Sequence, residues 1–428
     1  MSARLVLVLI TGIGLVYRLV LMHLSNVQRT RPLPPEVSDV YDPDRYQKYL
    51  GYVADNKKCG LAFGLAELAV TMLLLFSGVF AALERAASGN VYRIYLYTML
   101  LFLAAQSLTG IPARWVDRFV IEEKYGMNRQ DRRGFIKDTL LSLVQETVLT
   151  GALGLALVFI GEHLPRWTRG FTLLPWQVLA LVLALSLSLG LLVLLASLFS
   201  LWILKKQYTF TPMPEGPLKE KIMRLQEGSK RRVSRIYVYD ESRKSTSKNA
   251  FLLKLLWHRE FGIADNFLRE NAEDELLGVL SHEIGHLRHR RNLLNYLSLA
   301  QIPAVLLAMG ALLLNPAPVQ ALTGWVRASF GLSVNNYYLL METAASLLSP
   351  LLYVRGVFEN YRSRQEEYEA DREAVKNGYG PALITAFKQL SRDELVNVNP
   401  HPAIEFLEYN HPGMASRIRA MEKEGGRA

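Results

Sequence analysis

The sequence predicts an all-α integral membrane protein whose spanning helices are interrupted by two polar blocks. Half of the 428 residues are hydrophobic, and they are gathered into long runs. A helix needs about 20 apolar residues to cross a bilayer. Seven segments come near that length: Leu5–Leu24, Leu61–Leu83, Ile94–Thr109, Leu140–Ile160, Trp176–Leu204, Leu297–Leu314 and Tyr337–Tyr353. The polar blocks are residues 205–295 and the chain after residue 354.

The first apolar segment is expected to stay in the membrane. It lacks the short core and small-residue cleavage site of a signal peptide. The third and seventh segments are short, whereas the fifth is long enough to tilt. Cys59 is the only cysteine, which excludes an intrachain disulfide and a cysteine-rich metal site.

The basic residues indicate which way the chain crosses the membrane. The formal net charge is +10, and lysine and arginine are concentrated in the first, third and fifth connections and in the C-terminal tail. The positive-inside rule therefore places the N-terminus outside and both polar blocks and the C-terminus in the cytosol. Contact with anionic lipid headgroups accounts for the charge, and no nucleic-acid partner is expected.

The first polar block contains the pattern H-E-x-x-H within "LLGVLSHEIGHLRHRRN". A helix expected to begin at Asn271 would place His282 and His286 one turn apart on the same face. Two such imidazoles can bind one Zn²⁺, and Glu283 between them can reach a water at the metal. The alternative is a surface helix in which the histidines occur by chance.

A catalytic zinc needs a third protein ligand, and the best candidate follows the last span. The stretch "SRQEEYEADREAV" places Glu367 and Asp371 one helical turn apart. One carboxylate could bind the metal while the other accepts a hydrogen bond from a ligand imidazole. The alternative is that these carboxylates belong to a helix face exposed to solvent and bind no metal.

Three runs in the first polar block are typical of strands: "RIYVYD", "NAFLLKLL" and "REFGIAD". A small sheet with an open edge would allow an extended peptide to pair its backbone alongside. Near the C-terminus, "YNHPGMASRI" contains His411 and Arg417. By itself this stretch is typical of a capped turn before a helix.

Together these motifs resemble the type I CAAX prenyl protease family. "SHEIGH" followed by "SRQEEYEAD" carries the resemblance, and four further stretches agree with it: "FVIEEKYGMNR", "FTPMPEGPLKEKI", "STSKNAF" and "YNHPGMASRI". The resemblance implies seven membrane helices that enclose a chamber, capped by a mostly helical gluzincin-type zinc metalloprotease domain with a small sheet. It also implies an endopeptidase similar to enzymes that trim C-terminal tripeptides from prenylated proteins.

The resemblance divides the chain into four parts. Residues 1–204 would hold spans one to five, and residues 205–295 the first part of the catalytic domain. Residues 296–355 would hold spans six and seven, and residues 356–428 the second part of the catalytic domain. The absence of a dilysine-type signal and the short outer loops suggest a prokaryotic member. The membrane would be the plasma membrane in a prokaryote and the endoplasmic reticulum in a eukaryote.

Carried over residue by residue, the resemblance implies one Zn²⁺ per chain held by His282, His286 and Glu367. Glu283 would be the general base, and Asp371 would support a ligand. The substrate would be a peptide or protein, with or without a covalently attached lipid. Membrane lipids would be further partners.

The resemblance implies roles for four more residues. Asn249 and Ala250 would lie on a strand beside which the peptide extends. His411 and Arg417 would lie near the scissile carbonyl or support the site. His411 could donate a hydrogen bond to the developing oxyanion, and Arg417 could orient one of the carboxylates by a charge-assisted bond.

Three other interpretations remain open at this stage. A quality-control membrane zinc protease of broad specificity would use the same chemistry, although such enzymes typically have about four spans. A site-two protease would place H-E-x-x-H within lipid, which the charged residues around this helix disfavour. A transporter or channel would use the metal structurally, and acidic residues within its spans would form an ion path.

Overall fold

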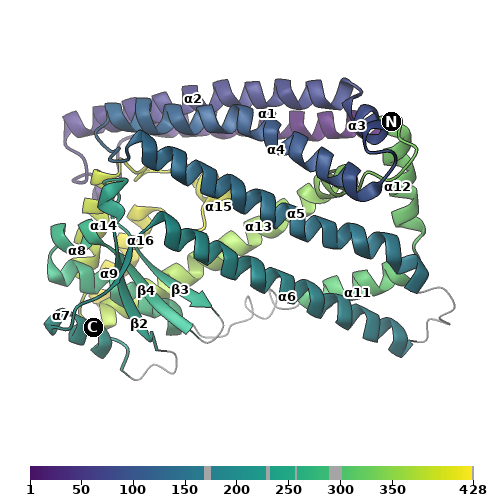
Figure 1. The fold of residues 1–428 in the computed structure, drawn as a ribbon. Coiled ribbons are helices and arrows are strands. Elements are labelled where there is room, and N and C mark those ends of the chain that lie inside the picture. The colour runs from purple at the N-terminus through teal and green to yellow at the C-terminus, as the bar shows by residue number, and fades with distance from the viewer. Residues whose placement is uncertain (168–174, 228–231, 256–257, 289–300, 427–428) are drawn as a thin grey trace.

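Long helices run side by side through most of the molecule (Figure 1). The computed structural model describes residues 1–167, 175–227, 232–255, 258–288 and 301–426. The helices of this part are α1 (Ala3–Arg29), α2 (Pro43–Phe76), α3 (Val79–Ala86), α4 (Val91–Val116) with its π-helical extension η2 (Asp117–Glu122), α5 (Arg132–Trp167), α6 (Pro175–Gln207), α11 (Gln301–Leu314), α12 (Ala317–Phe330) and α13 (Tyr337–Lys376).

A polar lobe lies at one end of these helices, beside the C-terminus, whereas the N-terminus lies at the other end (Figure 1). Its elements are η1 (Pro35–Val37), β1 (Phe210–Pro212), α7 (Pro217–Arg224), β2 (Arg235–Tyr239), η3 (Glu241–Arg243), β3 (Ala250–Leu255), β4 (His258–Ala264), α8 (Asp265–Glu270), α9 (Glu273–Arg288), α14 (Gly380–Asp393), α15 (Pro402–Glu408) and α16 (Met414–Gly425).

Five of the described helices are long and apolar enough to cross a membrane: α1, α2, α4 with η2, α5 and α6. They correspond to the first five expected spans. The expected end of the second span at Leu83 is wrong, because α2 ends at Phe76. Gly78 follows with φ +72°, a left-handed conformation that suits glycine and separates α2 from α3.

The sixth and seventh expected spans correspond to α11 and to the first part of α13. Residues 297–300 of the sixth span lie outside the described part of the chain. The seventh span, Tyr337–Tyr353, continues without a break as α13 for 40 residues in all. The count of seven membrane-crossing helices stays a prediction.

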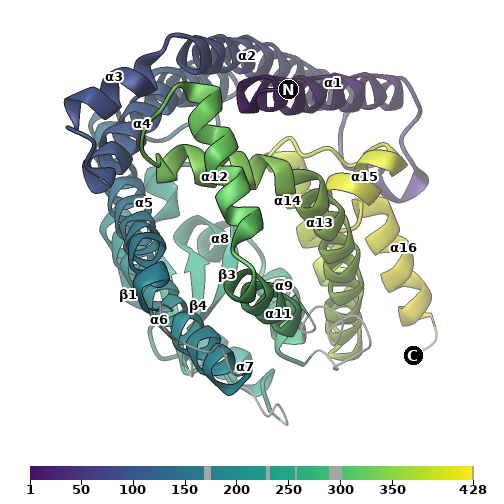
Figure 2. The same ribbon diagram turned by 90° about the vertical axis from the view of Figure 1, so that its right-hand side faces the viewer.

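Each long helix contacts the next, and the last one contacts the first, so the series closes on itself. α1 contacts α2, and the contacts continue through α4, α5, α6, α11, α12 and α13 back to α1. In the view of Figure 2 the helices form a ring, with much of the lobe behind it. This arrangement agrees with the expectation that helices enclose a space, although the chamber itself stays a prediction.

The lobe contains a four-stranded sheet with the order β1-β2-β4-β3. β2 and β4 are parallel, and the two outer strands are antiparallel to their neighbours. The three strands expected from the sequence are therefore present, and β3 is an edge strand of the sheet. An isolated bridge pairs Asn128 with Ser245, so two of the family-like motifs lie side by side.

One hydrophobic core joins the lobe to the connections between the membrane helices. Phe261 of β4 and Leu280 of α9 are fully buried in it, as is Val37 from the first connection. Tyr125, which follows η2, belongs to the same core. The lobe is therefore built from segments along the whole chain, and its core holds α9 against the ends of the membrane helices.

Candidate metal centre

Three possible metal ligands from two helices meet where α9 packs against α13. His282 and His286 lie one turn apart on α9, and Glu367 projects from α13. Their ligand atoms all lie within 4.8 Å of one another. The two Nε2 atoms are 3.2 Å apart. The carboxylate of Glu367 has one oxygen 3.3 Å from His286 Nε2 and the other 3.5 Å from His282 Nε2.

The sequence of α9 explains why both histidines face α13. Three acidic residues in its first turn suit the positive end of the helix dipole. An apolar stripe at helical spacing is almost completely buried in the lobe core, and this burial determines the rotation of the helix. The stripe consists of Leu276, Leu277, Leu280 and Ile284.

The expected helix start at Asn271 is wrong, because α9 begins at Glu273. The carboxylate of Glu275 accepts the backbone N–H of Ala272 at 3.3 Å. Asn271 instead donates its amide to Glu275 at 2.9 Å and to Gln389 of α14 at 3.1 Å. Its side chain therefore ties α9 to α14 and does not cap the helix.

Gly285 allows α9 and α13 to approach closely beside the three ligands. A Cβ at this position would lie 2.7 Å from the Cα of Ala370 and 3.1 Å from its Cβ. Contacts this short do not occur between packed carbon atoms, so only glycine fits here. Gly285 was not among the expected site residues, although it stands inside the H-E-x-x-H pattern.

Replacing Gly285 by alanine is expected to lower the melting temperature and the zinc content together. The added methyl group must separate α9 from α13, and such overpacking costs about 1–3 kcal/mol. Gly356→Ala on α13 is the matched control, because a Cβ there meets no other atom within 4 Å. Wild-type thermal stability and zinc content in Gly285→Ala would show that the helices do not cross as described.

Asp371 determines which nitrogen of His282 faces the other ligands. Its Oδ1 lies 2.9 Å from His282 Nδ1. Since an ionised carboxylate only accepts hydrogen bonds, Nδ1–H donates to Asp371, and Nε2 is the nitrogen that faces the other two ligands. Arg417 of α16 donates to both oxygens of Asp371, at 2.8 Å from Nε and 2.6 Å from Nη2. The guanidinium also lies over the ring of Phe387, 4.2 Å from its centroid.

The electrostatics of the cluster favour bound positive charge. Burial lowers the pKa of His282, but Asp371 and Glu367 outweigh burial and raise this pKa to about 9. Burial opposes ionisation of Glu367, yet hydrogen bonds from both histidines hold its pKa well below the usual range. Burial also opposes ionisation of Asp371, whose pKa Arg417 lowers. Both carboxylates are therefore negative at neutral pH.

The donor set fits a zinc ion. Two imidazole nitrogens and one carboxylate oxygen form a common ligand set for catalytic zinc, which keeps its fourth position open. Glu367 Oε2 is buried and has no hydrogen-bond partner among the described residues. Arg417 Nη2 lies 3.3 Å from this oxygen without a hydrogen bond to it, and a bound cation would coordinate the oxygen and remove the cost of burying it unpaired.

Glu283 lies on the same helix between the two histidines and is half-buried. Burial lowers the pKa of Arg417, but Asp371, Glu367 and Glu283 together raise it above its usual value. Glu283 is therefore close enough to the cluster for its negative charge to stabilise the buried guanidinium of Arg417.

His411 reaches the cluster from the connection between α15 and α16. Its Nε2 lies 3.4 Å from Glu367 Oε1, and desolvation by the surrounding protein lowers its pKa although 56% of the side chain is exposed. Arg364 of α13 holds this connection by donating to the backbone carbonyls of Glu405 and Tyr409. Arg364 was not among the expected site residues either, although it stands in the same "SRQEEYEAD" run as Glu367.

Ala250 begins the edge strand β3, which packs against α9, and Asn249, also expected on this strand, directly precedes it. The carbonyl of Asn249 accepts the N–H of Ala264 at 2.8 Å, toward β4. Because successive residues of a strand point their backbone groups to opposite sides, the N–H and C=O of Ala250 face the open edge of the sheet. A backbone pairing edge therefore lies next to the H-E-x-x-H helix.

Two family profiles match the chain. The CAAX prenyl protease N-terminal family, described as five membrane helices, matches residues 23–189. Peptidase family M48 matches residues 212–425, which include all of the cluster described above. The two matches together cover most of the chain, residues 23–189 and 212–425.

Individual proteins are similar over almost the whole chain. The CAAX prenyl protease 1 homolog of Arabidopsis thaliana is 26% identical, with 92% of this chain and 91% of the relative covered. The Homo sapiens homolog is 25% identical, with 92% and 89% covered. The crystal structure of S. mikatae Ste24p has the same fold, with a TM-score of 0.76, 22% identity and coverage of 98% and 99%. The chain belongs to peptidase family M48 and is a multi-pass membrane metalloendopeptidase that uses zinc.

Proposed function

We propose that this enzyme removes a short C-terminal peptide from lipid-modified proteins at the cytosolic membrane surface. The observation that carries the proposal is the path of α13, which begins in the expected seventh span and continues to Glu367. Glu367 lies 14 residues beyond Tyr353, or about 21 Å along the helix. The catalytic cluster is therefore within reach of a substrate whose lipid stays in the bilayer.

In this proposal His282, His286 and Glu367 hold the zinc. When bound, zinc supplies Lewis-acid chemistry, which polarises the peptide carbonyl and makes water nucleophilic near neutral pH. Glu283 takes a proton from the attacking water and delivers it to the leaving amine. Asp371 keeps the proton of His282 on Nδ1, so that Nε2 can act as a ligand.

His411 donates a hydrogen bond to the carbonyl oxygen as negative charge develops on it. Donation requires a proton on Nε2, and the neighbouring Glu367 oxygen at 3.4 Å favours that proton because it can only accept. Nδ1 lies 2.8 Å from Asn410 Oδ1; with the amide turned by 180°, so that its nitrogen and oxygen exchange places, its NH₂ group would donate to this nitrogen. Arg417 acts as a positioning residue, because its contacts are with Asp371 and Glu367.

The substrate peptide pairs with the open edge of β3, where the N–H and C=O of Ala250 face outward. Strand addition holds the peptide extended through its main chain, so that a scissile bond can be presented to Glu283. This mode recognises the peptide backbone. Substrate specificity then comes from the lipid and from pockets for the side chains.

Ala250→Pro is expected to lower kcat/KM about fivefold, because it removes one backbone donor worth roughly 1 kcal/mol. The fold should tolerate the change, since this N–H does not pair with β4 and proline is accepted on edge strands. Ala250→Val keeps the N–H and serves as the matched control. An unchanged kcat/KM in the proline variant, with zinc content intact, would exclude this pairing.

We further propose that the N-terminus lies outside and the lobe in the cytosol. The lobe lies at the end of the long helices (Figure 1) where the connections rich in lysine and arginine also lie, and such connections favour the cytosol. The division into residues 1–204, 205–295, 296–355 and 356–428 belongs to the same proposal. The sixth and seventh spans then separate the two parts of the catalytic domain.

A peptide-cleavage assay on the purified full-length protein tests the proposed substrate. A farnesylated CAAX peptide should be cleaved with a kcat/KM well above that of the same peptide without the lipid, and a chelator should abolish both activities. Equal cleavage of both peptides would favour the quality-control alternative. Failure to cleave any peptide, with zinc bound, would exclude the proposed function.

A further inference from the structure

The membrane helix α1 holds α15, and the connection that carries His411 begins where α15 ends. Gln28 of α1 donates to Asn399 Oδ1, just before α15, at 3.0 Å. Further toward the start of α1, Tyr17 donates to the carboxylate of Glu408, the last residue of α15. The two helices therefore lie side by side and run in opposite directions (Figure 2). Through these two bonds α1 reaches the segment next to the catalytic cluster.

Two tyrosines from different helices share the carboxylate of Glu408. The hydroxyl oxygens of Tyr17 and of Tyr353 on α13 lie 2.6 Å apart, and the two rings meet edge to face with centroids 5.5 Å apart. Tyr353 Oη lies 3.3 Å from the same carboxylate oxygen that Tyr17 contacts. Because a carboxylate only accepts hydrogen bonds, the tyrosines are the donors. The carboxylate therefore joins α1, α13 and α15 at one point.

The face of α13 that carries the expected zinc ligand also holds α15. Four residues recur along it at spacings of one or two helical turns: Tyr353, Asn360, Arg364 and Glu367. Asn360 donates to the carbonyl of Leu407 at 3.1 Å, and Arg364 donates to two further carbonyls of the same segment. The contact at Tyr353 is thus the membrane-side end of a row of bonds that leads to the metal cluster.

His411 depends on these bonds because its own side chain is more than half exposed. Packing does not fix the position of its ring, so the backbone of the connection determines where Nε2 lies relative to Glu367. Glu405 Oε1 accepts the N–H of Gly413 at 2.9 Å and closes the connection into a loop. Glu408 stands at the start of that loop, so a shift of Glu408 is passed on to His411.

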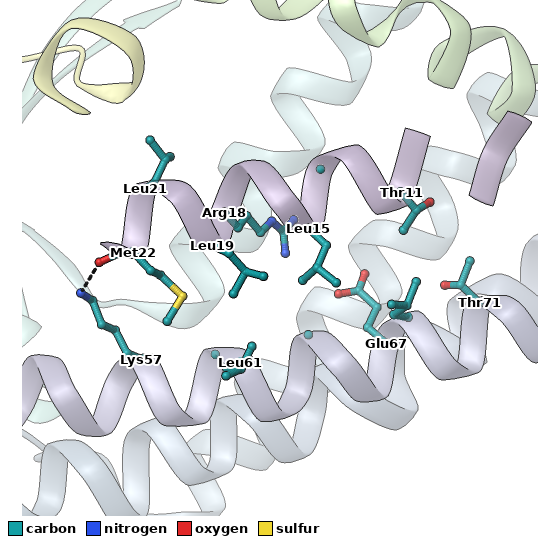
Figure 3. A pocket seen from close by; sticks show the side chains of 14 residues that line it. Thr11, Leu15, Arg18, Leu19, Leu21, Met22, Lys57, Leu61, Glu67 and Thr71 are labelled. Atoms are coloured by element: carbon teal, nitrogen blue, oxygen red, sulfur yellow. Dashed lines mark hydrogen bonds between the residues drawn. The ribbon is translucent and has the colours of Figure 1, made fainter. Parts of the chain in front are cut away.

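A groove lies between α1 and α2, on a different face of α1 from Tyr17. It encloses about 600 Å³, and most of its lining residues are apolar. Arg18 projects into it toward Glu67 of α2 (Figure 3). At this level α1 is therefore less constrained from the side of α2, and the contact of Tyr17 with Glu408 takes a larger part in fixing its position.

We propose that Tyr17 and Tyr353 are positioning residues of the peptidase, which hold Glu408 and thereby place His411 for its hydrogen bond to the scissile carbonyl oxygen. This inference rests on the proposed function, in which His411 donates to that oxygen. Catalytic groups must be held within about 0.5 Å of their productive geometry. The two tyrosines act on turnover through His411, so a membrane helix contributes to the precision of the active site.

The test is a double-mutant cycle on the purified full-length protein, with a farnesylated CAAX peptide as the substrate. His411→Ala should lower kcat about 10²–10³-fold, as loss of an oxyanion donor does. Tyr17→Phe keeps the ring and removes only the hydroxyl. It should lower kcat about tenfold and leave KM unchanged, because a misplaced donor weakens binding of the transition state alone. In the His411→Ala background, Tyr17→Phe should change kcat by less than about twofold.

Three further variants separate positioning from a general disturbance of the helices. Tyr353→Phe should lower kcat by a smaller factor, because its hydroxyl lies 3.3 Å from the carboxylate. Glu408→Gln keeps an oxygen that accepts the hydroxyl protons, so it should retain more activity than Glu408→Leu. Tyr97→Phe is the matched control, because it removes an exposed hydroxyl from the membrane helix α4, and it should cleave at the wild-type rate.

Two results would overturn the inference. One is wild-type kcat in Tyr17→Phe, and the other is an equal loss of kcat from Tyr17→Phe with and without His411. Zinc content should match the wild type in every tyrosine variant, and zinc lost together with kcat would assign the tyrosines to the stability of the whole cluster instead. Wild-type kcat in His411→Ala is a separate outcome, which would refute the function proposed for His411 itself.

Discussion

Glu283→Gln is expected to bind one zinc per chain and to lose about 10²–10⁴-fold in kcat. Glutamine has nearly the same shape as glutamate, so the packing of α9 should not change. It cannot accept the proton of the attacking water, however, and general base catalysis typically contributes a factor of about this size. Single-turnover cleavage of a peptide, with zinc measured by elemental analysis of the same sample, provides both quantities.

The matched control is Glu273→Gln in the first turn of the same helix. Glu273 is exposed and bonds to Lys221, and an exposed pair of this kind contributes about 1 kcal/mol or less. Its kcat should remain within about twofold of the wild type. Wild-type turnover by Glu283→Gln would exclude Glu283 as the general base.

Glu367→Gln is expected to release zinc and with it the peptidase activity. The carboxylate is negative, buried and in contact with His282, His286 and Arg417. An amide removes the negative charge that attracts the cation and leaves the guanidinium with one partner fewer. Zinc affinity should fall by roughly tenfold or more, as measured by competition with a fluorescent chelator.

Glu366→Gln is the control for this change, because Glu366 is adjacent in sequence and bonds to Arg362. It should retain the wild-type zinc affinity and cleave peptides at the wild-type rate. A Glu367→Gln protein that held zinc as tightly as the wild type would contradict the proposed ligand set. Loss of zinc affinity in both variants would indicate a general disturbance of α13.

The local elements of the fold could be predicted because they depend on residues close together in the sequence. Long apolar runs predict membrane helices, and five of these helices meet the length and composition needed to cross. The alternating run "RIYVYD" predicts a strand, which is β2. Helix ends were predicted less well. The end of α2 depends on the left-handed Gly78, and the start of α9 depends on Glu275, which accepts the N–H of Ala272.

The two histidines of the candidate site and the residues that join them from later in the chain were predicted on different grounds. The spacing of His282 and His286 predicts that they share one helix face, which follows from helix geometry alone. The acidic stretch after the last span offered Glu367 or Asp371 as the third ligand, and the resemblance to a family selected Glu367 and added His411. Arg364 and Gly285 carried no recognised signal, because their roles depend on contacts with residues 41 and 85 positions away in the sequence.

The sequence by itself determined the membrane helices, the strands and the helical faces that carry the possible ligands. These depend on hydrophobic periodicity and on local backbone geometry, which neighbouring residues specify. The tertiary structure decided which faces meet. The close approach at Gly285 brings α13 to α9, Arg417 reaches Asp371 from 46 residues away, and the strand order leaves β3 at an edge beside α9. These pairings depend on burial of a shared core, which no local pattern specifies.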